Sequence, residues 1–317
     1  MSTKRPSFSA MRTTPLSQRK ADSREQDFAA PYHAGGTLAD FLCSLPNLGM
    51  AGELFAVRDA IVRAHRKRHT VLLAMGGQFF DAGLSPLLIR LIEQGVINGL
   101  ALTGAAMIRD IEITLYGNTF TSSIAALRAG DLVVPEETGR IINEAINLGA
   151  SENWGIGQSL GKRLLDGGFE HLEHSVIATA HRYGIPLSVH PAMGADTFHF
   201  HPSVHGESMG AAAMLDVRLL TGMLADAAHG VVLNIASNAI MLRVLLMALS
   251  AARNLGHEVD HLHAVDIDVT PNTAGGMHCM QRLSRPKGRF SRLQGPDELI
   301  VPLLFAAVID ALGDEVA

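Results

Sequence analysis

Several kinds of residue are scarce in this chain of 317 residues, and each scarcity excludes a class of protein. Two cysteines, Cys43 and Cys279, are too few for a disulfide framework or for a zinc site built on thiolates, and they fit a reducing compartment. The net charge is −5, so no broad basic surface indicates binding of nucleic acid. We therefore expect no nucleic-acid partner.

Long apolar runs free of polar residues are also missing. The most apolar region, residues 231–252, is interrupted by polar residues, whereas a bilayer helix needs roughly 20 residues that are almost all apolar. The interrupting residues are Asn234, Ser237, Asn238 and Arg243. We therefore expect no membrane span and no membrane partner, and we predict a cytoplasmic location.

The first 35 residues differ in composition from the rest of the chain. Basic residues stand there among many Ser and Thr, with little apolar periodicity. An apolar core of about 7–15 residues, which a secretory signal needs, is absent, and Asp22, Glu25 and Asp27 argue against an organellar transit peptide. We predict a flexible basic arm over residues 1–35 and a single domain over residues 36–317.

What the chain does contain is an alternation of helix and strand patterns. Hydrophobic residues make up 47% of the sequence, and 31 glycines favour tight turns between strand and helix. Short apolar runs predict strands, and the longer segments between them show helical periodicity. We expect an α/β fold with a single doubly wound, mostly parallel, Rossmann-like sheet and helices on both faces. The predicted strands cover residues 69–75, 96–103, 185–190, 230–235 and 261–269.

The predicted strands end in turns rich in Gly, Ser, Thr, Asn and Asp. In a parallel sheet, ligands bind beyond the carboxyl ends of the strands, where such turns present N–H groups to phosphate and carboxylates to ribose. Neither GxGxxG nor a GxxxxGK[ST] loop is present. The five polar turns together still predict a nucleotide site. Its candidate cofactor-binding residues are Gly76, Gly77, Thr103, Gly104, Asp196, Ser237 and Asp266.

The order of these motifs resembles that of deoxyhypusine synthases. The segments 75–79, 94–96 and 102–105 are similar to the nucleotide-binding start of that family, and later motifs run in the same order over roughly residues 45–312. The resemblance implies a deoxyhypusine synthase-like fold, NAD as cofactor and a homotetramer. It also implies an amine or polyamine substrate, oxidised to an imine by hydride transfer to NAD before its alkyl group moves to an acceptor amine. Asp196 matches an Asp that helps to hold NAD in the family.

The family's active-site signature is absent. Instead of Glu, Ser, Trp and Gly before a nucleophilic lysine, the sequence around Lys287 is Arg-Leu-Ser-Arg-Pro-Lys-Gly, and residues 234–242 contain no histidine. Lys287 is a candidate covalent nucleophile, which requires a lowered pKa. It could equally belong to a basic cluster that binds an acidic ligand or phosphate, or to a surface loop.

Two histidines and three carboxylates complete the candidate site. On an extended chain His199 and His201 would point the same way, close to Asp196, so we consider them as acid–base groups or alternatively as metal ligands. Asp268, at a strand end, is a candidate substrate-binding residue, as is Glu207, which could instead interact with a helix dipole.

The leading hypothesis is an NAD-dependent transferase that acts on an amine. The alternatives are a metal-dependent hydrolase or lyase built on Asp196, His199 and His201, and a non-catalytic oligomeric binding protein.

Overall fold

The computed structural model describes residues 7–120, 129–237, 240–269 and 274–316, and the chain divides into two units, Met1–Gly52 and Glu53–Ala317. The first unit contains helix α1 (Leu38–Ser44), which is capped by Thr37. The Thr37 hydroxyl accepts a hydrogen bond from the Asp40 N–H, and the Asp40 carboxylate accepts one from the Thr37 N–H. The sequence analysis placed the end of the arm at residue 35, whereas the division in the structure follows Gly52.

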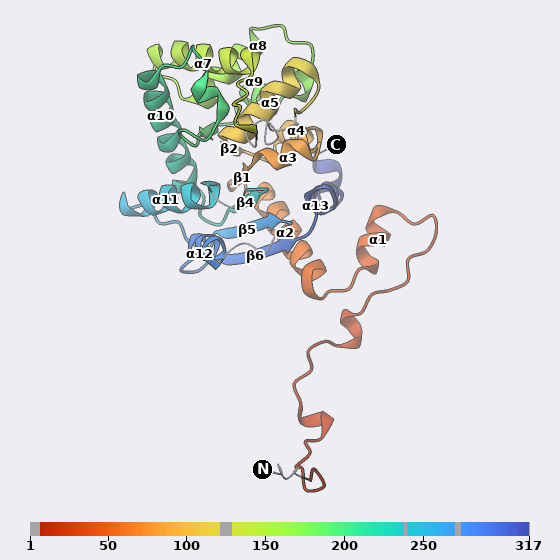
Figure 1. The fold of residues 1–317 in the computed structure, drawn as a ribbon. Helices are drawn as coiled ribbons and strands as arrows, with labels where there is room; N and C mark the ends of the chain where they lie inside the picture. The colour runs from red at the N-terminus through yellow and green to blue at the C-terminus, as the bar shows by residue number, and fades with distance from the viewer. Residues whose placement is uncertain (1–6, 121–128, 238–239, 270–273, 317) are drawn as a thin grey trace. The chain divides into compact units, whose positions relative to one another are not determined.

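The second unit is built on one parallel sheet of six strands in the order β3-β2-β1-β4-β5-β6 (Figure 1). Every residue of the first five strands is buried, because helices cover both faces and the strands are rich in Val, Leu and Ile. The expected doubly wound α/β fold is confirmed. The strands are β1 (Val71–Met75), β2 (Gly99–Thr103), β3 (Leu187–His190), β4 (Val231–Ile235), β5 (His263–Asp268) and β6 (Arg289–Gln294).

Helices connect the strands, and most of them lie where the apolar periodicity predicts. Three of them, α3, α5 and α12, were not predicted. The remaining helices, with these three, are α2 (Gly49–Arg66), α3 (Gly77–Asp81), α4 (Ser85–Glu93), α5 (Gly104–Tyr116), α7 (Glu136–Ser151), α8 (Ile156–Leu165), α9 (Val176–Arg182), α10 (Gly206–Ala225), α11 (Ile240–Asn254), α12 (Ala274–Leu283) and α13 (Asp297–Leu312).

Strand β6 was also missed by the sequence analysis. It is the last strand of the sheet, paired on one side with β5, and its side chains alternate between buried and accessible. Arg289, Arg292 and Gln294 break the apolar run that identifies a central strand. Polar side chains are typical of an edge strand, so the strand carries a weak sequence signal.

The core lies between the sheet and its helices. On one face, alternate residues of β1, such as Leu72 and Ala74, pack in a cluster with residues of α10, α11 and α12. The intervening residues Val71, Leu73 and Met75 are equally buried, so the second face of β1 is covered as well. Rigid packing on both faces fixes the positions at which the strands end.

Of the helices that the structure describes, α10 is the one that is long and apolar enough by composition to cross a membrane. It contacts α7, α11 and β3, and its Asp216 is buried against the chain. Asp216 accepts hydrogen bonds from the N–H groups of Val189 (2.7 Å) and Gly157 (3.1 Å). These contacts give α10 a structural role within the unit.

Candidate functional site

The carboxyl ends of all six strands meet at one edge of the sheet, which we name the carboxyl edge. In the order β3-β2-β1-β4-β5-β6, the chain runs to one side of β1 first and then to the other, so the connections diverge between β1 and β4. Parallel sheets bind ligands in the crevice at such a point. The structure brings to this edge the predicted residues Gly76, Gly77, Thr103, Gly104, Asp196, Ser237, Asp266 and Asp268; Asn238 lies outside the described residues.

At the junction of β1 and β4 the two turns touch. The N–H of Gly76 donates to the carbonyl of Ile235 (3.1 Å), and a Cβ on residue 76 would overlap the carbonyl oxygen of Ala236. Ala236 itself has a φ of 54°, a left-handed conformation that is unfavourable for a residue with a Cβ. A strained residue at the point where the connections diverge is typical of a functional turn.

At the junction of β2 and β3, Asp196 lies against Gly104. A Cβ on residue 104 would overlap the Asp196 carboxylate, so glycine is required for this approach. Asp196 accepts a hydrogen bond from the N–H of Ala192 (2.7 Å), and burial raises its pKa despite that bond. The Thr103 hydroxyl accepts from the N–H of Ala106 (3.1 Å) and so caps helix α5. Asp196 therefore places a negative charge near the N-terminus of α5.

Asn234 links the ends of β4 and β5. Its side-chain amide donates to the carbonyl of Ser237 (2.7 Å) and to the carboxylate of Asp266 (2.9 Å), and all three residues are buried. The Asn234 amide oxygen is also buried, and no described residue donates to it. Among the described residues it is thus an acceptor that receives no hydrogen bond, and it lies beside the predicted cofactor residue Ser237.

The sequence analysis missed one carboxylate of this edge, Asp297. It is the first residue of α13, directly after β6, and is only 3% exposed. Burial and repulsion from Asp268 and Glu298 raise its pKa from 3.8 to about 6. Its Oδ1 atom accepts no hydrogen bond from a described residue. The Gly-Pro pair before Asp297 is a helix-start signal, but Asp297 comes to this edge only because β6 precedes it.

Asp268 and Asp297 therefore form a buried pair of like charges. Asp268 is the last residue of β5 and is also buried, and its backbone carbonyl accepts from the N–H of Gly295 at the end of β6. Two carboxylates in a buried position are stabilised by a cation or by sharing a proton. A cationic amine carries the positive charge that compensates such a pair, and an N–H donor for the Asp297 Oδ1 atom.

The segment with His199 and His201 is not extended, so the expectation that both imidazoles point the same way is wrong. Residues Thr197–Phe200 form a 3-10 turn. Both ring nitrogens of His199 are buried without a hydrogen-bond partner among the described residues, and burial lowers the pKa of its imidazole, although Asp196 opposes that shift. The His199 ring also contacts the ring of Phe198, with 4.2 Å between the ring centres and an angle of 38° between the planes.

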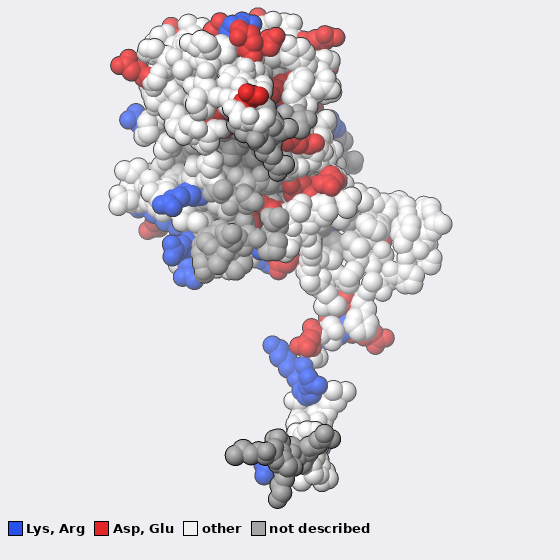
Figure 2. Space-filling model, viewed as in Figure 1, with Lys and Arg blue, Asp and Glu red and all other residues white. Residues whose placement is uncertain are grey.

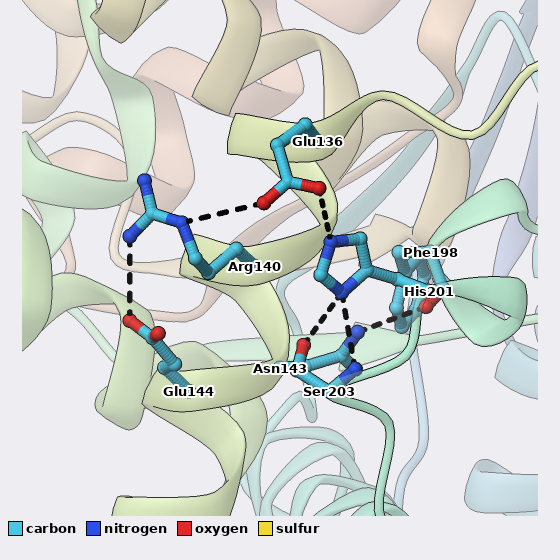
Figure 3. Close-up of polar contacts among 7 residues, drawn as sticks. All are labelled: Glu136, Arg140, Asn143, Glu144, Phe198, His201 and Ser203. Carbon is cyan, nitrogen blue, oxygen red and sulfur yellow. Dashed lines mark hydrogen bonds and ion pairs between the residues drawn. The ribbon is translucent and has the colours of Figure 1, made fainter.

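His201 is held by partners of its own (Figure 3). Its Nδ1 accepts from the backbone N–H of Ser203 (3.2 Å) and lies 2.7 Å from the Ser203 hydroxyl, so Nε2 is the nitrogen that donates to Glu136 (3.2 Å). Arg140 flanks Glu136 on α7. Within the described part of the chain, Asp196, His199 and His201 form no group that could hold a metal ion. The metal-dependent alternative has no support from this geometry.

Two other predicted residues lie apart from the group at the carboxyl edge. Lys287 precedes β6, so it lies at the opposite, amino-terminal edge of the sheet. Its ammonium is 2.6 Å from the Asp260 carboxylate, which raises the lysine pKa, whereas an imine-forming lysine needs a lowered one. Glu207 is exposed in the first turn of α10, the position that favours an interaction with the helix dipole.

Comparisons with known proteins identify relatives by structure alone. No model of a protein family matches the chain, and no curated protein matches its sequence. A protein from Entamoeba histolytica, provisionally assigned as a deoxyhypusine synthase, has a similar structure with a TM-score of 0.52 at 15% identity, over 88% of this chain and 95% of that one. A conserved protein from Methanococcus maripaludis S2, provisionally assigned as LOR/SDH, gives a TM-score of 0.54 at 14% identity, over 83% and 71% of the two chains.

The third similar structure is AgrE without ligands, with a TM-score of 0.55 at 17% identity over 85% of this chain. The match covers 34% of AgrE, so the chain corresponds to about a third of that protein. AgrE is also known in a ternary complex with ornithine and NAD⁺, which matches with a TM-score of 0.50 at 16% identity. The predicted resemblance to deoxyhypusine synthases is confirmed for the fold.

Proposed function

We propose that this chain is an NAD-dependent enzyme that acts on an amine or polyamine at the carboxyl edge of its sheet. The observation that carries the proposal is the buried pair Asp268 and Asp297, which lies at the ends of β5 and β6 on the β4 side of the β1/β4 junction. Two similar structures support it: AgrE forms a complex with ornithine and NAD⁺, and another relative is provisionally a deoxyhypusine synthase.

The residues at the carboxyl edge fit NAD. Gly76 and Gly104 let the turns approach one another closely, because each lies against an oxygen atom of a neighbouring turn. The Asn234 amide oxygen beside Ser237, to which no described residue donates, is suited to a hydroxyl donor. Asp196 adds a carboxylate that could accept from a ribose hydroxyl. When bound there, NAD would supply the acceptor for a hydride from the substrate carbon.

Within this proposal, the acidic pair binds the substrate and takes up its proton. Asp268 holds the ammonium group by charge, and Asp297, with a pKa of about 6, accepts a proton from it at Oδ1. Loss of that proton gives the neutral amine that oxidation to an imine requires. His199 follows β3, at the other end of the strand order from Asp268 and Asp297, so we give it no part in taking up this proton.

The finer proposal is a transferase, in which the alkyl group of the oxidised amine passes to an acceptor amine. We assign no covalent role to Lys287, because its ammonium is paired with Asp260 and it lies at the other edge. We also propose a homotetramer, as the resemblance to deoxyhypusine synthases implies. The exposed apolar side chains Met214 and Val217 of α10 are a surface that another copy would cover.

The test is calorimetric binding of NAD, and of spermidine in the presence of NAD, with NADH formation followed by absorbance. We expect wild type to bind both, and Asp297→Asn to retain NAD binding while spermidine binding weakens about tenfold. Asp310→Asn, which removes an exposed carboxylate from the same helix, is the matched control. The proposal fails if NAD does not bind or if both variants behave alike.

A further inference from the structure

Two cavities adjoin each other at the amino-terminal edge of the sheet, opposite to the candidate site. The first, which we name the amino-edge cavity, has a volume of 230 Å³ and lies where β1, β4 and β5 begin. The second has a volume of 430 Å³, and His69 lines both. The side chains that determine the chemistry of the amino-edge cavity are Arg63, Lys67, His69, His229, His261 and His263.

Three of these imidazoles form a row. The ring centres of His69 and His229 are 5.7 Å apart, and those of His229 and His261 are 4.8 Å apart with the ring planes inclined by 13°. His229 and His261 have φ angles of 60° and 57°, so both adopt the left-handed conformation that non-glycine residues avoid. The fold thus keeps two unfavourable backbone conformations that place imidazoles at one cavity.

The charges that face the cavity are basic. Arg63 and Lys67 form no ion pair with a carboxylate of the described residues, and the lining contains no Asp or Glu. Two carboxylates interact electrostatically with lining imidazoles, Asp260 with His261 and Glu53 with His263. Each already has a basic partner, Lys287 for Asp260 (2.6 Å) and Arg289 for Glu53 (3.0 Å). Outside the cavity lining, Lys and Arg side chains also lie around α12 and β6, with Asp and Glu side chains among them, on the face that Figure 2 displays. The cavity therefore has an excess of positive charge.

This arrangement favours an anion over a metal ion. Stacked rings turn their faces to one another instead of converging their nitrogens on one point, and the described residues hold no group that could bind a metal. Arg63 and Lys67 would repel a cation. The volume is below the roughly 300–1,000 Å³ of pockets for drug-sized ligands, so the anion is small.

We propose that the amino-edge cavity binds a phosphoryl group, carried by inorganic phosphate or by a small phosphate monoester. Arg63 and Lys67 supply the charge, and the imidazoles of His69, His229 and His261 supply further donors to the phosphate oxygens. This site is separate from the carboxyl edge and does not depend on the proposed reaction there.

The test is calorimetric titration of the full chain, in buffer free of phosphate and at low salt, with inorganic phosphate and separately with glycerol phosphate. We expect saturable binding of one molecule per chain, weakened about tenfold or more in Arg63→Gln and in Lys67→Gln. Arg90→Gln, which removes an exposed charge from α4, should change the affinity less than twofold. Tighter binding of glycerol phosphate assigns the site to monoesters, and tighter binding of phosphate assigns it to the free ion.

Four results would overturn the proposal. They are the absence of saturable binding, equal losses in Arg63→Gln and Arg90→Gln, binding of zinc chloride but not of phosphate, and loss of NAD binding in Arg63→Gln. The last result would mean that the cavity belongs to the cofactor site. Thermal unfolding of each variant checks that the fold is kept, and both substituted side chains are exposed, so their replacement leaves the core intact.

Discussion

Replacing Asp297 by Asn should stabilise the protein without ligands, and only at neutral and alkaline pH. In the folded state the pKa of Asp297 is raised from 3.8 to about 6, whereas in the unfolded chain it returns to its ordinary value. Folding therefore costs free energy once the carboxyl is ionised in both states. The cost is absent below about pH 4 and complete above about pH 7.

The magnitude follows from the size of the shift. A difference of about 2 pKa units corresponds to about 3 kcal/mol at 1.36 kcal/mol per unit. The free energy of unfolding of Asp297→Asn should thus exceed that of wild type by about 3 kcal/mol at about pH 8, and match it at about pH 4.

Urea unfolding followed by circular dichroism, at several pH values between these limits, measures the difference directly. Asp310→Asn removes an exposed carboxylate from the same helix and should leave the pH dependence unchanged. The reasoning about Asp297 is refuted if its variant is no more stable than wild type at the higher pH. A gain of the same size at every pH would refute it too.

Three further predictions concern the contacts that hold the site. Gly104→Ala should displace the Asp196 carboxylate and lower the free energy of unfolding by about 1–3 kcal/mol. In the control Gly210→Ala the added Cβ meets open space, so that variant should lose far less stability or gain some. Thermal unfolding of the two variants measures the difference. In Asp216→Ala the buried N–H groups of Val189 and Gly157 lose their acceptor. The free energy of unfolding in urea should fall by about 3 kcal/mol, and a fall of less than about 1 kcal/mol contradicts this. Burial lowers the pKa of His190 to about 4. As the pH falls, the unfolded chain is protonated at this histidine before the folded chain is, so the free energy of unfolding falls between about pH 6.5 and 4. His190→Gln should reduce that fall, and an unchanged pH profile would show that His190 does not cause it.

The convergence of the strand ends could be predicted from the sequence because it depends only on parallel strands. Short apolar runs located β1 to β5, and parallel pairing then brings the turns after them to one edge. The residues of those turns can therefore be identified from the sequence without knowledge of the pairing. The contacts between individual turns could not be predicted from the sequence. The contact of Gly104 with Asp196, for example, depends on how β3 pairs with β2.

The missed strand β6 accounts for the largest differences between the predicted site and the site in the structure. When β6 is not recognised, the sequence does not show at which edge of the sheet Lys287 lies. In the structure Lys287 directly precedes a parallel strand, so it lies at the amino-terminal edge. The same strand carries the chain to the carboxyl edge and so brings Asp297 beside Asp268. His199 and His201 diverge for a local reason, because a 3-10 turn replaces the extended segment on which their common direction depended.

The central claim is that the carboxyl edge is the face that binds NAD, and hydrogen–deuterium exchange with and without NAD tests it most directly. We predict slower exchange at the backbone amides of residues 76–80, 104–107 and 236–237, with little change where β1, β4 and β5 begin. Protection confined to residues 67–70, 229–231 and 261–263 would place the dinucleotide at the opposite edge and contradict the account.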